Sequence, residues 1–82
     1  MTNFHYVYIL VDCTTNTHYY VGKTHDLKAR LAGHNSGQCP HTSKYMPWKI
    51  KNAIAFDVEE KATAFETFLK THSGRVFTKK HF

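Results

Sequence analysis

Two short segments rich in tyrosine and β-branched residues most constrain how this chain can fold. Residues 4–11 (Phe-His-Tyr-Val-Tyr-Ile-Leu-Val) and 19–24 (Tyr-Tyr-Val-Gly-Lys-Thr) have the composition of β-strands. The polar segment between them suits a hairpin loop. Because side chains alternate along a strand, pairing around this loop would place Tyr8 and Tyr20 on the same face of a sheet. Gly22 indicates either a bulge or the close approach of another group.

The segment after the second strand predicts an amphipathic helix over residues 27–36. Asp26 or Thr24 can accept hydrogen bonds at its start. At about 100° per residue, His34 shares one arc with the leucines of this segment, and Arg30 lies at the edge of that arc. Both polar side chains therefore border the buried face of the helix.

The rest of the chain predicts a third strand and a second helix. Residues 48–57 alternate between large side chains and lysines, which is the period-two pattern of a strand. Residues 59–73 predict the helix, with Gly74 just beyond its end. We expect a loop at 38–47, which holds both prolines, and assign no structure to 75–82. These elements predict an α/β fold of the α+β type, a small three-stranded antiparallel sheet flanked by helices.

Composition indicates one small domain over residues 1–82. A net charge of +5 and an isoelectric point near 9.4 favour a polyanionic partner such as nucleic acid. Cys13 and Cys39 fit a reducing compartment and cannot form a disulfide framework. We find no signal peptide and no apolar run of about 18 residues, and therefore expect a cytoplasmic protein without a membrane segment.

Several motifs occur in one order along nearly the whole chain. They are Tyr6-Val7-Tyr8-Ile9-Leu10, Tyr19-Tyr20-Val21-Gly22-Lys23-Thr24, Asp26-Leu27-Lys28-Ala29-Arg30-Leu31, His34-Asn35-Ser36-Gly37, Pro47-Trp48-Lys49-Ile50 and the helical segment from Glu66 to Ser73-Gly74-Arg75. In this order they resemble the small single-domain proteins of the GIY-YIG nuclease superfamily. The resemblance implies metal-dependent hydrolysis of a phosphodiester bond in nucleic acid, with DNA as the favoured substrate.

The resemblance also implies catalytic roles for polar side chains from two strands and two helices. They are Tyr8, Tyr20, Lys23, Arg30, His34 and Glu66. Tyr8 would hold the attacking water and act as the general base or relay to it, while Tyr20 would orient around the same phosphate. Arg30 would clamp that phosphate, and His34 would accept a proton or contact the phosphate. Glu66 would hold a single Mg²⁺ or Mn²⁺ ion.

The residue types suit this chemistry. A phenol with an ordinary pKa of about 10 is a poor base at neutral pH, but Lys23, Arg30 and a divalent ion would each favour phenolate. The planar fork of arginine can make two charge-assisted hydrogen bonds to phosphate. Mg²⁺ often needs only one or two protein carboxylates, of which Glu66 is one. Strict alternation places Lys23 on the face opposite Tyr20, so its role needs a twist or bulge near Gly22.

Other basic residues can contact the substrate backbone, or can simply form a solvated surface. For substrate binding we predict Lys44, Lys49 and Arg75. Many family members carry a late asparagine that contacts phosphate, but this chain has none after Asn52. Ser73, Arg75 or Thr78 would have to substitute for it.

The missing asparagine keeps other functions open. A non-cleaving nucleic-acid-binding module of the same fold is the main alternative, and an interaction protein without a nucleic-acid role is another. A zinc site formed by His34, Cys39 and His41 is a weaker alternative, since the spacing lacks a paired CxxC or HxxxH motif. A homodimer could cut both strands of a duplex, although no residue demands it.

Overall fold

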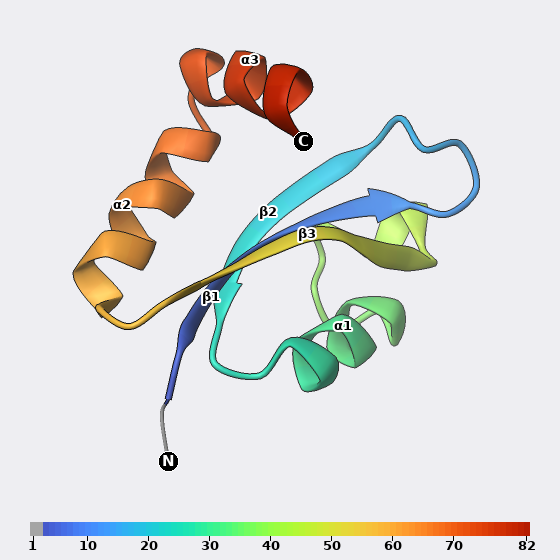
Figure 1. Ribbon diagram of the computed structural model, residues 1–82. Helices are drawn as coiled ribbons and strands as arrows, with labels where there is room; N and C mark the ends of the chain where they lie inside the picture. The colour runs from blue at the N-terminus through green and yellow to red at the C-terminus, as the bar shows by residue number, and fades with distance from the viewer. Residues whose placement is uncertain (1–2) are drawn as a thin grey trace.

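An antiparallel sheet of three strands forms the centre of the fold (Figure 1). The computed structural model describes residues 3–82. The strands are β1 (His5–Asp12), β2 (Tyr19–Thr24) and β3 (Trp48–Phe56), in the order β2-β1-β3. β1 is therefore the central strand and β2 an edge strand. The predicted class, a small three-stranded antiparallel sheet flanked by helices, is confirmed.

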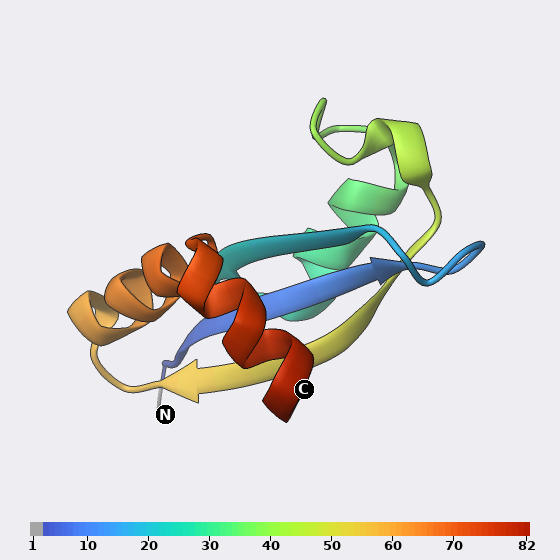
Figure 2. The same ribbon diagram turned by 90° about the horizontal axis from the view of Figure 1, so that it is seen from above.

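Helices cover both faces of this sheet (Figure 2). α1 (Leu27–Asn35) and the short 3-10 helix η1 (Ser43–Tyr45) follow β2 and lie on one side of it. α2 (Glu59–Leu69) and α3 (His72–His81) follow β3 and lie on the other side. No helix among residues 3–82 is long and apolar enough to cross a membrane.

Because side chains alternate along β1, a separate hydrophobic core lies on each face of the sheet. Tyr8 and Leu10 are buried on the side of α1, where they pack with Trp48. Val7 and Ile9 are buried on the side of α2, where they pack with Leu69. Each fully buried side chain of this size contributes about 1.5–3 kcal/mol. The two faces of β1 therefore hold both helical layers in place.

A bulge in β3 divides its large side chains between these two cores. Ile9 pairs with Asn52, but the next residue of β1, Leu10, pairs with Ile50, so Lys51 is the extra residue. A strand of strict period two would place all its large side chains on one face. Instead Trp48 and Ile50 join the core beside α1, and Phe56 joins the core beside α2.

The N-cap of α1 follows the sequence prediction. The side chain of Asp26 accepts a hydrogen bond from the backbone N–H of Ala29, so Asp26 is the N-cap. At the other end Ser36 is the C-cap, and Gly37 takes a positive φ of 81°. Glycine adopts this left-handed conformation without steric cost, which is why the helix ends there.

The predicted C-terminal end of the second helix is wrong. α2 ends at Leu69 rather than at residue 73, and Gly74 lies inside the first turn of α3 rather than beyond a helix end. The side chain of Thr71 caps α3 by accepting from the N–H of Gly74. A Cβ atom at Gly74 would overlap the carbonyl of Phe68, so glycine lets α3 turn tightly across the end of α2.

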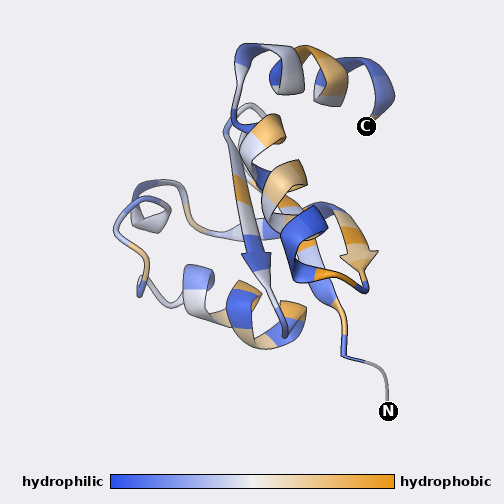
Figure 3. Ribbon diagram, turned by 90° about the vertical axis from the view of Figure 1, so that its left-hand side faces the viewer, coloured by the Kyte–Doolittle hydropathy of each residue, from blue (hydrophilic) through white to orange (hydrophobic). Residues whose placement is uncertain are grey.

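Residues 75–82, to which the sequence assigned no structure, therefore belong mostly to α3. This helix is largely hydrophilic, with one short hydrophobic stretch (Figure 3). Phe77 and the C-terminal Phe82 pack against the core that contains Leu69. Two aromatic rings thus attach a basic helix to the sheet.

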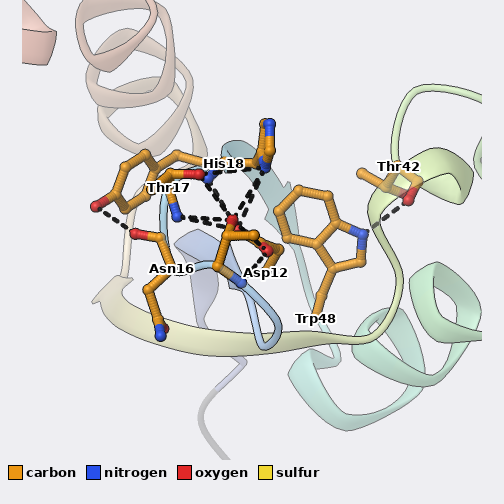
Figure 4. A network of polar contacts seen from close by, with 8 residues as sticks. Asp12, Asn16, Thr17, His18, Thr42 and Trp48 are labelled. Carbon is orange, nitrogen blue, oxygen red and sulfur yellow. Dashed lines mark hydrogen bonds and ion pairs between the residues drawn. The ribbon is translucent and has the colours of Figure 1, made fainter.

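One buried carboxylate organises the β1–β2 loop (Figure 4). Asp12 is 2% exposed and accepts hydrogen bonds from the backbone N–H groups of Thr15, Thr17 and His18, at 2.7, 3.0 and 2.9 Å. The hydroxyl of Thr15 donates a further bond at 2.8 Å. Burial opposes the charge, but these four donors outweigh it and hold the pKa of Asp12 well below its usual range.

We predict that Asp12→Asn destabilises the fold at neutral pH and flattens its dependence on acid. Because the folded-state pKa is depressed, the stabilisation is fully present above the ordinary value of 3.8. It is lost as the pH falls through the folded-state value. Urea unfolding of both proteins between neutral and strongly acidic pH measures this difference.

Asp57→Asn is the matched control, since Asp57 is exposed and accepts no side-chain hydrogen bond among residues 3–82. We expect it to behave like the parent chain. An Asp12→Asn difference that stays constant down to strongly acidic pH would contradict the role of the carboxylate charge.

Candidate active site

The ring of Tyr8 lies directly over Gly22 of the neighbouring strand. The two residues face each other in the β1–β2 ladder. A Cβ atom at Gly22 would overlap the ring and hydroxyl of Tyr8, so glycine leaves the space that the ring occupies. Of the two interpretations of Gly22, close approach is confirmed. The register shift lies instead between β1 and β3, beside Ile9.

A continuous chain of hydrogen bonds starts from this tyrosine. Arg30 on α1 donates from Nε to the Tyr8 hydroxyl at 3.2 Å, and the same hydroxyl lies 2.9 Å from Nε2 of His34. Nδ1 of His34 lies 2.8 Å from the hydroxyl of Thr42. That hydroxyl donates to the carbonyl of Cys39 at 3.3 Å. Arg30 and His34 are one helical turn apart, so both reach the same phenol.

One arrangement of hydrogens satisfies every member of this chain. The hydroxyl of Thr42 donates to Cys39, so its oxygen accepts from Nδ1–H of His34. Nε2 is then an acceptor and receives the O–H of Tyr8, whose oxygen accepts from Arg30. His34 is therefore a neutral imidazole with its lone pair toward the phenol.

Burial and charge both keep His34 neutral. The side chain is fully buried, and burial lowers the pKa of its imidazole from the ordinary 6.5. The nearby positive charge of Arg30 lowers it further. The imidazole is therefore available as a proton acceptor at neutral pH.

Tyr8 itself is not prepared as a phenolate, which corrects part of the sequence interpretation. Burial is the largest influence and raises the pKa of Tyr8 above the ordinary value of 10.0. The hydrogen bond and charge of Arg30 act in the predicted direction but only partly offset burial. Before any substrate or metal is bound, the phenol keeps its proton.

Tyr20 joins the cluster through its ring. Its centroid lies 4.9 Å from that of His34 and 6.5 Å from that of Tyr8. Both tyrosines thus lie on the same face of the sheet, as the alternation of side chains predicts. The Tyr20 hydroxyl makes no hydrogen bond to another part of the chain within residues 3–82.

Lys23 points away from this cluster. Its Nζ donates to the hydroxyl of Thr63 at 2.8 Å and lies 3.5 Å from a carboxylate oxygen of Glu59, both on α2. β1 and β2 pair without a bulge that would turn Lys23 back toward Tyr20. Lys23 is therefore not placed to lower the pKa of Tyr8.

Glu66 lies on the flank of α2 that runs along the edge strand. Glu59, Thr63, Glu66 and Lys70 recur at helical spacing and share this flank. Because Lys23 of β2 contacts the first two, the flank lies next to β2. Glu66 is paired with Lys70 at 3.3 Å and makes no hydrogen bond to Tyr8, Arg30 or His34. The structure therefore brings together Tyr8, Tyr20, Arg30 and His34, with Glu66 across β2.

The predicted substrate-binding cations are spread over the surface. Lys44 lies over the ring of Tyr45, 5.6 Å from its centroid, beside α1. Arg75 lines a cavity of about 760 Å³ between α3 and the sheet, on the other side. Lys49 is exposed on β3 and does not line this cavity. The cavity gains its charge from three further lysines and is also lined by Tyr20. The lysines are Lys51, Lys70 and Lys79.

Two polar residues that support the site were not identified from the sequence. Thr42 is fully buried and holds His34, and its carbonyl accepts the indole N–H of Trp48 at 2.7 Å. Asn35 accepts from the N–H of Trp48 at 2.6 Å and donates to its carbonyl at 3.0 Å, which fastens α1 to β3. Neither has a local signal in the sequence, because both partners are distant along the chain.

The zinc alternative that included His34 is not supported by this geometry. Both ring nitrogens of His34 are engaged, one by Tyr8 and one by Thr42. No ring nitrogen is left to bind a metal ion unless this chain of hydrogen bonds is broken.

Comparison with known proteins identifies the family of this fold. The model of the GIY-YIG catalytic domain matches residues 4–80, so the chain belongs to the GIY-YIG family. Domains of this family are of the endonuclease type. No solved structure matched the chain.

Relatives named UPF0213 protein match most of this chain. That of Streptococcus pneumoniae serotype 4 is 39% identical over 66 residues, which cover 79% of this chain and 65% of the relative. That of Lactococcus lactis subsp. cremoris is 38% identical over 69 residues, covering 83% and 68%. That of Streptococcus pyogenes serotype M5 is 37% identical over 71 residues, covering 85% and 75%. The chain thus spans slightly less than two thirds of the S. pneumoniae relative.

We predict that Gly22→Ala lowers the free energy of unfolding by about 1–3 kcal/mol, the usual cost of overpacking. The added methyl group would meet the ring of Tyr8, which is buried and cannot move aside freely. Gly33→Ala is the control, because its methyl group would meet only the flexible end of Gln38, at 3.1 Å. Urea denaturation measures both. Equal effects of the two substitutions would contradict the close approach of Tyr8.

The hydrogen-bond chain predicts a neutral His34 carrying its proton on Nδ1. Nitrogen NMR of the imidazole should report this tautomer at neutral pH, with a pKa below 6.5. Arg30→Gln removes the repelling charge and should raise the pKa of His34 toward its ordinary value. Lys28→Gln, an exposed change on the same helix, should leave it unaltered. A proton found on Nε2 would contradict the assigned direction of the chain.

Proposed function

We propose that the chain is a metal-dependent endonuclease that hydrolyses phosphodiester bonds of nucleic acid, with DNA as its substrate. One observation carries the proposal, the hydrogen-bonded chain of Arg30, Tyr8, His34 and Thr42. It joins a cation suited to phosphate directly to a phenol and a neutral imidazole. Water attack on phosphate is helped by a positioned proton acceptor and by a cation that stabilises the developing charge, and this chain offers both.

Arg30 would bind the scissile phosphate. Its Nε is committed to Tyr8, whereas its terminal amino groups make no hydrogen bond to other parts of the described chain. The side chain is exposed, so a phosphate can approach these free donors. A guanidinium can donate two charge-assisted bonds to phosphate and stabilise the charge that grows in the transition state.

Tyr8 would relay a proton rather than act as a standing phenolate. As water attacks phosphorus, the Tyr8 oxygen takes a proton from it while the phenolic proton passes to Nε2 of His34. The leaving oxygen takes a proton from solvent. His34 then returns its proton to the Tyr8 oxygen, and Tyr8 releases the proton that it took from water to solvent. The raised pKa of Tyr8 is compatible with this route, because the phenol never has to lose its proton in advance.

Glu66 fits the requirement for a single Mg²⁺ or Mn²⁺ ion. It offers carboxylate oxygens, and its side chain is only partly exposed, with 21% accessible. Its partner Lys70 has a flexible side chain that is 53% exposed, so Lys70 can move away when a cation binds Glu66. A bound ion of this kind would neutralise phosphate charge and polarise the attacking water. One protein carboxylate is sufficient when substrate phosphate supplies other ligands.

The position of β2 supports a substrate that crosses the edge of the sheet. Tyr20 faces the cluster of Tyr8 and His34, while Glu66 and Lys70 lie along the other side of the same strand. Arg75 lines the cavity near Lys70. A nucleic-acid backbone lying over β2 would meet groups from both helical layers.

The test is a cleavage panel on plasmid, branched DNA, single strands and RNA, with Mg²⁺, Mn²⁺ or EDTA. We expect metal-dependent cleavage that Glu66→Ala and Tyr8→Phe abolish. Arg30→Ala should slow it by about 10²–10³-fold, as loss of a transition-state donor does. Glu60→Ala and Lys28→Ala, exposed changes on the same two helices, should leave the rate unchanged.

Two other outcomes reject the proposal. Cleavage that survives both Glu66→Ala and Tyr8→Phe would come from another protein in the preparation. Salt-sensitive binding without cleavage of any substrate would identify the non-cleaving module instead. The homodimer and the cytoplasmic location stay predictions, and sedimentation with and without duplex would test the first of them.

A further inference from the structure

Two histidines and a glutamate gather at the end of the sheet away from the β1–β2 loop. His5 is the first residue of β1, His25 directly follows β2, and Glu59 is the first residue of α2. One ligand atom from each lies within 4.8 Å of the others. We propose that these three side chains form a binding site for a transition-metal ion of the Zn²⁺ class.

The backbone fixes the starting positions of all three. Tyr6 pairs with Thr24 in the β1–β2 ladder, so the two histidines stand one step beyond that pair, His5 at the start of β1 and His25 just after the end of β2. Their rings meet edge to face with centroids 4.6 Å apart. His5 shares its sheet face with Val7, which is the face that α2 covers. The carboxylate at the start of α2 therefore lies beside the two rings.

Small side-chain rotations would complete the geometry. Zinc binds imidazole nitrogen and carboxylate oxygen at about 2.0–2.2 Å, so two ligands of one tetrahedral ion lie roughly 3.4 Å apart. The three atoms already lie within 4.8 Å of one another. No ring nitrogen of His5 or His25 is engaged in a hydrogen bond within residues 3–82, so neither ring would give up a partner.

The ligand types select the metal. Imidazole suits Zn²⁺, Co²⁺, Ni²⁺ and Cu²⁺, whereas Mg²⁺ prefers oxygen ligands alone. The site is therefore chemically separate from Glu66, which offers only carboxylate oxygen. Three protein ligands leave at least one position for water. A bound ion would fasten the open end of the β1–β2 ladder to the start of α2.

Lys23 provides a built-in competitor. Its Nζ lies 3.5 Å from a carboxylate oxygen of Glu59, but it also donates to the hydroxyl of Thr63 at 2.8 Å. A metal ion on Glu59 would displace the lysine from the carboxylate and leave it on Thr63. Lys23→Met should therefore strengthen metal binding, roughly two- to fivefold, which corresponds to a typical exposed ion pair.

The experiment is titration of the untagged full chain with Zn²⁺ by calorimetry, and with Co²⁺ by visible absorption. We expect one ion per chain. His25→Ala and Glu59→Gln should each weaken binding by about tenfold or more, since even the outer partners of metal ligands matter to that extent. Both residues are exposed, so these variants should keep the fold, which circular dichroism checks. Zn²⁺ should also raise the urea midpoint of the parent chain but not of the variants.

The controls separate this site from ordinary surface histidines and from the proposed nuclease site. His72→Ala and Glu60→Gln change exposed residues outside the cluster and should bind Zn²⁺ like the parent chain. Glu66→Gln should do the same. Unchanged affinity in both His25→Ala and Glu59→Gln, or no one-to-one binding at all, would overturn the site. Equal or weaker binding by Lys23→Met would show that Glu59 is not a ligand and would overturn the three-ligand arrangement.

Discussion

The rest of the site depends on the contact between the phenol of Tyr8, in the central strand β1, and Gly22 in the edge strand β2. Tyr8 is only 2% exposed, so most hydrogen-bond partners of its hydroxyl must come from the protein. Arg30 and His34 do so from successive turns of α1. This fixes where α1 lies and how it is rotated. The absence of a side chain at Gly22 therefore determines where α1 packs on the sheet.

α1 is held by polar contacts as much as by apolar burial. Its only fully buried residue is His34, and its end is fastened to β3 through two hydrogen bonds between Asn35 and Trp48. A buried polar group left without a partner costs about 1–3 kcal/mol. Each misplacement of α1 would leave Tyr8, His34 or Thr42 in that state. The network thus selects a single position for the helix, which an apolar stripe alone would specify less sharply.

Features that neighbouring residues determine could be predicted from the sequence, whereas features that depend on packing against distant segments could not. Strand composition, the Asp26 cap and the spacing of Arg30 and His34 are read from neighbouring residues, and all three agree with the structure. The bulge at Lys51 and the helix break before Gly74 depend on how β3 and α3 pack against distant segments. The expectation that neighbouring charges favour phenolate at Tyr8 was wrong for the same reason. The charges can be read from the sequence, but the depth of burial that raises the pKa of Tyr8 cannot.

The direction of Lys23 shows how an edge strand can serve both helical layers at once. Alternation sends Tyr20 toward α1 and Lys23 toward α2, so β2 presents different chemistry on each face. An exposed strand edge flanked by lysine is also protected from pairing with other chains. Lys23 is paired with Glu59 at the start of α2, whereas Lys51, Lys70, Arg75 and Lys79 line the cavity between α3 and the sheet. A polyanion drawn to β2 would thus meet positive groups on both faces while the histidine pair at the strand end stays free for a cation.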